Sequence, residues 1–135
     1  MRMVCVAVIL CAALLAMRCC AEKISSGPGL GVMYAGVGVN VEYHMNESFS
    51  VAGGVNPFTS DFRWTLAGFF HPDVNNRLRL SVGLTNTLDI FSSDRDTEPF
   101  LGLGWAPSKQ DNYRGWNIDI IFGNGERSAS LGYSF

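Results

Sequence analysis

The end of the chain constrains the fold most, because it has the pattern of an edge strand with two unlike faces. Four apolar residues alternate with serine and glycine there: Ala129, Leu131, Tyr133 and Phe135. Such alternation is typical of a strand with one face in an apolar environment. Asn124-Gly125 precedes the strand and favours a tight hairpin turn. A terminal strand leaves an open edge unless it pairs with another strand, so we expect it to close a β-barrel with the first strand.

The start of the chain has the features of a secretory signal peptide. Arg2 precedes an apolar run from Met3 to Met17. That run is shorter than the roughly 20 residues that a membrane-spanning helix needs. Ala21 supplies a small residue at a suitable cleavage point. We therefore expect residues 1–21 to be a signal peptide and residues 22–135 to form the exported domain.

The cysteines agree with this division, since all four lie in the leader: Cys5, Cys11, Cys19 and Cys20. Cleavage as a lipoprotein at one of the last two is an alternative, although the small residue expected before such a cysteine is missing. A small exported domain without disulfides needs another source of stability, and insertion into a bilayer would supply it.

The charge of the exported domain argues against nucleic-acid binding. The whole chain has 10 basic and 12 acidic residues, and loss of Arg2 and Arg18 with the leader leaves 8 against 12, a net charge of about −4. A nucleic-acid-binding domain would carry a dense basic face instead. After the leader, the apolar residues are dispersed at every second position rather than gathered in a long run. This distribution favours membrane-spanning strands over helices.

Short alternating segments recur along the exported domain with turn residues between them, which is typical of an all-β protein. We expect residues 21–30 to be an irregular lead-in. Eight strands would follow, over residues 30–45, 49–56, 62–70, 77–85, 86–91, 100–106, 115–122 and 126–135. Their number depends on a break at Thr85-Asn86, because residues 77–91 could also form one strand and give an odd total. We expect the break, since single-chain bacterial barrels have an even number of strands.

The predicted fold is an antiparallel up-and-down transmembrane β-barrel, with apolar side chains toward lipid and polar side chains in the lumen. Side chains fill the interior of an eight-stranded barrel, and charges enclosed there need partners because an unpaired buried charge is costly. We therefore expect a lumen network of five residues: Glu42, Arg63, Arg77, Arg79 and Asp119. Filling of the lumen is the favoured role of this network, and gating of a narrow pore is the alternative.

Aromatic residues lie mostly near the ends of the predicted strands, as Tyr43, Phe62 and Trp116 do. Rings at strand ends predict two girdles at the boundaries of an apolar belt. Between the predicted strands, the acidic loop from Asp89 to Glu98 is the natural exposed segment for contact with a partner. A solvated turn is the simpler explanation of this loop.

Leu131, Tyr133 and the terminal Phe135 resemble the last strand of bacterial outer-membrane β-barrel proteins. In that family this strand is also the signal that the barrel assembly machinery reads. The rest of the chain is similar in pattern to the eight-stranded members, which include the membrane domain of outer-membrane protein A and the X and W types. The resemblance implies a monomer in the bacterial outer membrane, with outer-membrane lipid and the assembly machinery as partners. It implies a structural or surface protein, or a narrow conduit for small hydrophobic solutes.

Two other functions are alternatives. A secreted or periplasmic soluble β-barrel would bind a small apolar ligand, with its apolar faces turned inward. A lipid-modifying enzyme of the outer membrane would need serine and histidine near the membrane surface. His44 lies near Glu47 and Ser48 in the sequence and His71 opens a turn, but no catalytic arrangement follows from these positions. We therefore expect no enzyme and no cofactor, and two scattered histidines without cysteine predict no metal site.

Overall fold

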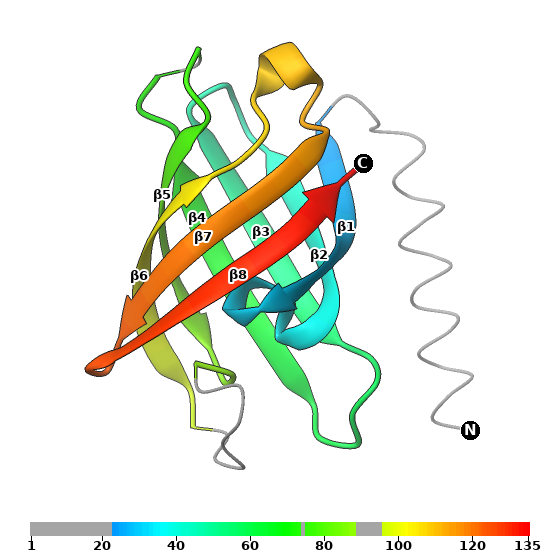
Figure 1. Ribbon diagram of the computed structural model, residues 1–135, viewed down its shortest axis with the longest axis vertical. Coiled ribbons are helices and arrows are strands. Elements are labelled where there is room, and N and C mark those ends of the chain that lie inside the picture. Colours follow the sequence, from blue (N-terminus) through cyan, green and yellow to red (C-terminus); the bar gives the residue numbers. More distant parts are fainter. Residues whose placement is uncertain (1–22, 74, 89–95) are drawn as a thin grey trace.

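The computed structural model describes residues 23–73, 75–88 and 96–135, and these form one closed antiparallel β-barrel (Figure 1). Each strand pairs with its neighbour in sequence, and β1 pairs with β8. The strands are β1 Ile24–Gly31, β2 Gly36–His44, β3 Phe49–Asn56, β4 Arg63–Phe70, β5 Leu78–Thr85, β6 Glu98–Trp105, β7 Gly115–Gly123 and β8 Glu126–Ser134. Two short 3-10 turns are η1 Val32–Tyr34 and η2 Lys109–Asp111. The predicted all-β barrel of eight strands is confirmed.

The predicted signal peptide, residues 1–21, lies outside the described residues. Within the part of the chain that the structure describes, no helix has the length and apolarity needed to span a membrane.

The first strand corrects the sequence prediction. Residues 21–30 were expected to be irregular, but Ile24–Gly31 forms β1, and η1 separates it from β2 where one long strand over 30–45 was expected. The strand was missed because its glycines carry no side chains and so display no alternating pattern. The same glycines are needed at the closure of the barrel. A Cβ added at Gly27 or Gly31 would overlap a backbone carbonyl oxygen of β8.

The break at Thr85-Asn86 is present, but residues 86–88 form no strand, and residues 89–91 of the expected strand lie outside the described residues. Asn86 marks the end of β5, because its amide makes a last bond to the Trp64 carbonyl at 3.2 Å and its side chain then bonds the start of β4. Its Oδ1 accepts from the amide of Trp64 at 2.8 Å, and its Nδ2 donates to the carbonyl of Phe62 at 2.8 Å. The total is eight because β1 takes the place of the expected strand over 86–91.

The two faces of the barrel wall have the predicted orientation, with apolar side chains outside and polar side chains inside. On the outer face, Leu101 is 63% exposed, Val82 58% and Ile118 51%. Inward-facing polar residues such as Thr85 and Asp119 are fully buried. Successive side chains of a strand point to opposite faces, so one register determines both the outward apolar side chains and the inward polar ones.

Part of the lumen is filled by η1, which folds into the barrel from the end opposite β8's last residues and packs against β1, β2, β3, β4 and β8. Val32, Met33 and Tyr34 are all buried. The Met33 amide donates to the Ser130 hydroxyl at 3.0 Å, and the Tyr34 hydroxyl donates to Asn117 Oδ1 at 2.6 Å. We call these three residues of η1 the plug.

The Tyr34 ring fits against Gly132 on β8, where a Cβ would overlap its hydroxyl and ring. We therefore expect Gly132→Ala to displace the ring and to lower the free energy of unfolding by about 1–3 kcal/mol, as overpacking of a core does. Gly53→Ala is the matched control, because a Cβ at Gly53 has no atom within 4 Å. Denaturant-induced unfolding of the two variants checks this. Equal midpoints would show that the plug does not need the space at Gly132.

Candidate functional site

A buried charge cluster crosses the lumen between β5 and β7. Arg79 Nε donates to Asp119 Oδ1 at 2.8 Å, and Arg79 Nη2 donates to Asp119 Oδ2 at 2.6 Å. Both residues pair in register with Gly104 on the intervening strand β6, where a Cβ would overlap the Asp119 carboxylate. The missing side chain on β6 therefore lets the two charged groups meet in a bidentate pair.

A second carboxylate, Glu42 on β2, completes the cluster from across the barrel. Arg79 Nη1 donates to Glu42 Oε2 at 3.2 Å, and the Ser50 hydroxyl donates to Glu42 Oε1. The guanidinium carbon of Arg79 lies 4.0 Å from the centroid of the Phe69 ring, which adds a cation–π contact. Arg79 is only 4% exposed, so this arginine holds two carboxylates in a site without free access to water.

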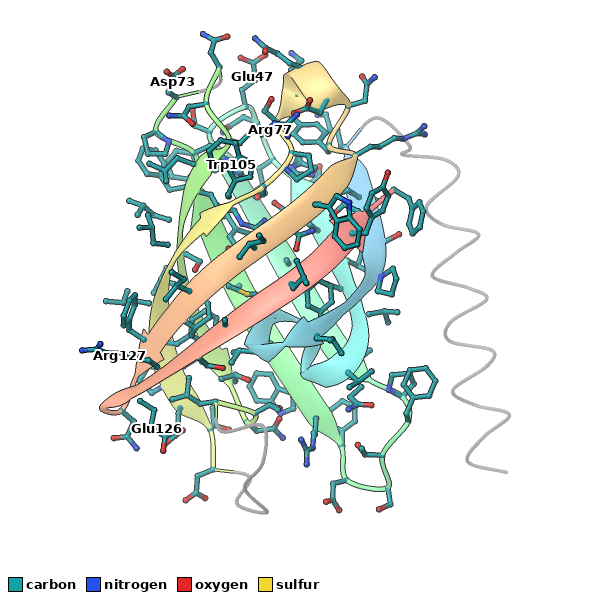
Figure 2. The ribbon with its side chains drawn as sticks, viewed as in Figure 1. Glu47, Asp73, Arg77, Trp105, Glu126 and Arg127 are labelled. Atoms are coloured by element: carbon teal, nitrogen blue, oxygen red, sulfur yellow. The ribbon has the colours of Figure 1, made fainter. Side chains whose placement is uncertain are left out.

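The structure brings together three of the five predicted network residues, Glu42, Arg79 and Asp119, and places the two other arginines elsewhere. Arg77 precedes β5 at the rim of the barrel (Figure 2), where its Nη2 lies 2.6 Å from Asp111 Oδ1. Arg63 begins β4, roughly 20 Å along the strand from Phe69 at six residues of strand rise. The alternation did not show that Arg77 lies before the start of β5, where its side chain is exposed at the rim.

Two histidines lie beside Glu42. His44 Nδ1 is 3.7 Å and His71 Nε2 is 4.0 Å from Glu42 Oε1. His44 Nε2 lies 3.0 Å from the Ser25 hydroxyl of β1. In the sequence, His44 lies near Ser48 and Glu47. The true neighbours follow from the register, because Ser25 is the ladder partner of Glu42.

Serine, histidine and carboxylate are the residue types of a nucleophilic triad. Here the His44–Glu42 separation of 3.7 Å exceeds a hydrogen bond, and Glu42 is already held by Arg79. Ser25 is 3% exposed. The arrangement suits a polar seal across the lumen better than attack on a substrate.

Burial lowers the pKa of His71, which lies just beyond β4. His71 is therefore neutral near pH 7 and adds no positive charge beside Arg79. At the rim, a backbone hydrogen bond from Ser108 lowers the pKa of Asp111, and Arg77 adds to this effect. The rim carboxylate of Asp111 is thus ionised over the whole neutral range.

Above the cluster, a cavity of about 740 Å³ opens at the end of the barrel where β1 begins and β8 ends. We call it the mouth cavity. Its charged and aromatic lining residues are Lys23, His44, Glu47, Lys109, Tyr113, Arg114 and Phe135. The His44 ring stacks on Tyr113 with 3.6 Å between centroids, so these two rings separate the cavity from the charge cluster below.

The three residues predicted as an assembly signal lie along the outward side of β8 and its end. Leu131 and Phe135 are exposed, and Tyr133 is half-buried. Tyr133 contacts Trp116 edge-on at 5.4 Å between centroids and contacts Phe135 at 5.1 Å. A row of rings therefore runs from the end of β8 onto the outer wall.

Among residues 23–73, 75–88 and 96–135, no group of histidine, cysteine and acidic side chains is arranged to hold a metal ion. Comparison of the chain with protein-family models, curated proteins and solved structures finds no match. The function is therefore inferred from the geometry of the barrel wall, the lumen and the mouth cavity.

Arg79 and Arg77 offer a direct test of what burial does to an ion pair. We expect Arg79→Met to lower the free energy of unfolding by about 3–5 kcal/mol, because it leaves two buried carboxylates without their counter-charge. Arg77→Met removes an exposed pair and should cost no more than about 1 kcal/mol. Chemical denaturation of both variants gives the comparison. Similar small losses would mean that the Arg79 site is hydrated.

Proposed function

We propose that the exported chain is an integral β-barrel of the bacterial outer membrane with a sealed lumen, acting as a structural or surface protein. The observation that carries this proposal is the apolar outer wall around a polar interior. Soluble proteins rarely expose continuous apolar patches larger than a few hundred Å². In a bilayer the apolar side chains of the wall would contact lipid acyl chains, and the closed sheet would satisfy the hydrogen bonds of its own backbone.

The dimensions of the wall suit a thin bilayer. The strands have 8 or 9 residues. At a rise of about 3.3 Å per residue and a tilt of about 40°, such strands span about 20 Å, near the apolar band of about 25 Å in outer-membrane barrels. The bacterial outer membrane is also thinner than an average bilayer.

Exposed rings lie at both ends of this wall, as membrane girdles do. Trp116 and Phe135 are 63% and 65% exposed at the end with the mouth cavity. Phe58 and Phe62 are exposed at the opposite end, in the connection between β3 and β4. Amphipathic and aromatic side chains favour the headgroup boundary, so the two sets would mark the two faces of the membrane.

The soluble alternative fits the interior poorly. A small apolar ligand would need an apolar lumen with free space, but the charge cluster and the plug occupy the lumen with bonded polar groups and buried side chains. The enzyme alternative lacks an exposed nucleophile at Ser25, which is 3% exposed. We propose a non-catalytic barrel in which Leu131, Tyr133 and Phe135 at the end of the last strand serve assembly into lipid.

A charge introduced on the outer wall by mutation distinguishes a membrane barrel from a soluble one, because it destabilises only a wall that lies in lipid. We expect Val82→Arg, in the middle of β5, to lower the free energy of unfolding in lipid vesicles by about 2–4 kcal/mol, the cost of arginine at a bilayer midplane. Ser60→Arg, in the exposed connection before β4, is the control and should have little effect. Urea titration in vesicles measures both. If the protein folds as a monomer in buffer without detergent and tolerates Val82→Arg, it is a soluble barrel.

The sealed lumen predicts that the protein conducts no ions across a planar bilayer. We expect neither the natural chain nor Arg79→Met to show steady single-channel conductance, because the plug closes the lumen independently of the charge cluster. An established porin in the same bilayer controls for insertion conditions. Stable openings of the natural chain would favour the narrow conduit over the sealed barrel.

A further inference from the structure

The lining of the mouth cavity has more cationic than acidic side chains, with Lys23, Lys109 and Arg114 against Glu47. Lys109 forms an ion pair with Glu47, and Glu47 is the acidic side chain of the lining. Within the described part of the chain, Lys23 and Arg114 form no ion pair, and both are exposed at the cavity. An ammonium and a guanidinium group therefore face one cavity of about 740 Å³ without an acidic side chain as ion-pair partner. Arginine in particular matches the geometry of phosphate oxygens.

The cavity also has an apolar side that leads out onto the barrel wall. Ile24, Met45 and Phe135 line it. Phe135 contacts Tyr133, and Tyr133 contacts Trp116 on the outer face. A molecule seated between the two free cations would thus have a continuous apolar surface from the cavity to the lipid-facing belt. A free anion would leave that surface unused.

We propose that the mouth cavity binds the phosphate headgroup of an anionic amphiphile, with Lys23 and Arg114 as its cationic contacts and an acyl chain lying over Phe135 and Tyr133. This inference rests on the proposed membrane location, which puts the cavity at the level of lipid headgroups. Charge-assisted hydrogen bonds from both cations would hold the phosphate. The stacked rings of His44 and Tyr113 form the floor on which the headgroup rests.

The experiment uses the mature chain, refolded in micelles of an uncharged detergent and shown to be folded by its heat-dependent shift on a gel. Native mass spectrometry then counts bound short-chain phosphatidylglycerol, phosphatidylcholine or inorganic phosphate. We expect one phosphatidylglycerol per chain in clear preference to phosphatidylcholine, and much weaker binding of inorganic phosphate. Lys23→Gln and Arg114→Gln should each weaken phosphatidylglycerol binding roughly fivefold, as loss of one exposed ion pair would.

Arg127→Gln is the matched control, because Arg127 is an exposed arginine on the hairpin at the opposite end of the barrel (Figure 2). It should leave lipid binding unchanged, while Phe135→Ala should weaken binding of the lipid but not of inorganic phosphate. Equal binding of the two lipids, equal effects of Arg127→Gln and Arg114→Gln, or phosphate binding as tight as lipid binding would each overturn the inference. These outcomes are measured on a folded micellar barrel, so they differ from a chain that folds in plain buffer, which would overturn the membrane location itself.

Discussion

Closure of β1 against β8 is the constraint on which the rest of the structure depends. The ladder there is short, with Gly29 opposite Gly132 and Leu30 opposite Leu131, and the Phe135 amide extends it by donating to the Ser26 carbonyl at 2.8 Å. An open edge leaves backbone groups unpaired, and in the proposed bilayer no water would satisfy them, so a barrel that fails to close loses the backbone bonds between β1 and β8. The glycines of β1 serve this closure, because a side chain facing the β8 backbone would hold the strands apart.

Once the barrel is closed, its small lumen decides which charges it can contain. Arg79 sits where three strands are in register and the middle one contributes only Gly104, so there is room for a bidentate pair with Asp119. Glu42 then shares the same guanidinium group. Two carboxylates for one arginine give the cluster an excess negative charge, and the nearest groups that could offset it are His44 and His71. Burial keeps His71 neutral, so the carboxylates depend on hydrogen bonds such as that from Ser50.

The sequence predicted those parts of the fold in which large apolar side chains alternate with polar ones. β4 and β5 were predicted because apolar and polar residues alternate along them, as Leu66 does with Thr65 and Leu80 with Arg79. β1 and the plug were not, because a glycine-rich strand has no visible faces and a buried loop between strands has no periodicity. The contact of Ser25 with His44 depends on the β1–β2 register, which no local pattern contains. For these alternating segments, the sequence therefore predicted the strands and the face that each side chain takes, but it did not predict which residues of different strands contact each other.

The lumen is layered along the barrel axis, and the layers limit what the mouth cavity can do. The stacked rings of His44 and Tyr113 line the cavity, the charge cluster around Arg79 lies below them, and the plug packs beside the cluster, with Tyr34 bonded to Asn117. The mouth cavity therefore opens at one end of the barrel, with Phe135 at its edge and the filled lumen below it. The layers are also in contact, since His44 lines the cavity and approaches Glu42, which holds Arg79. A charge bound at the mouth is thus separated from the buried arginine by two side chains, and its field acts on the buried Arg79–Asp119 pair.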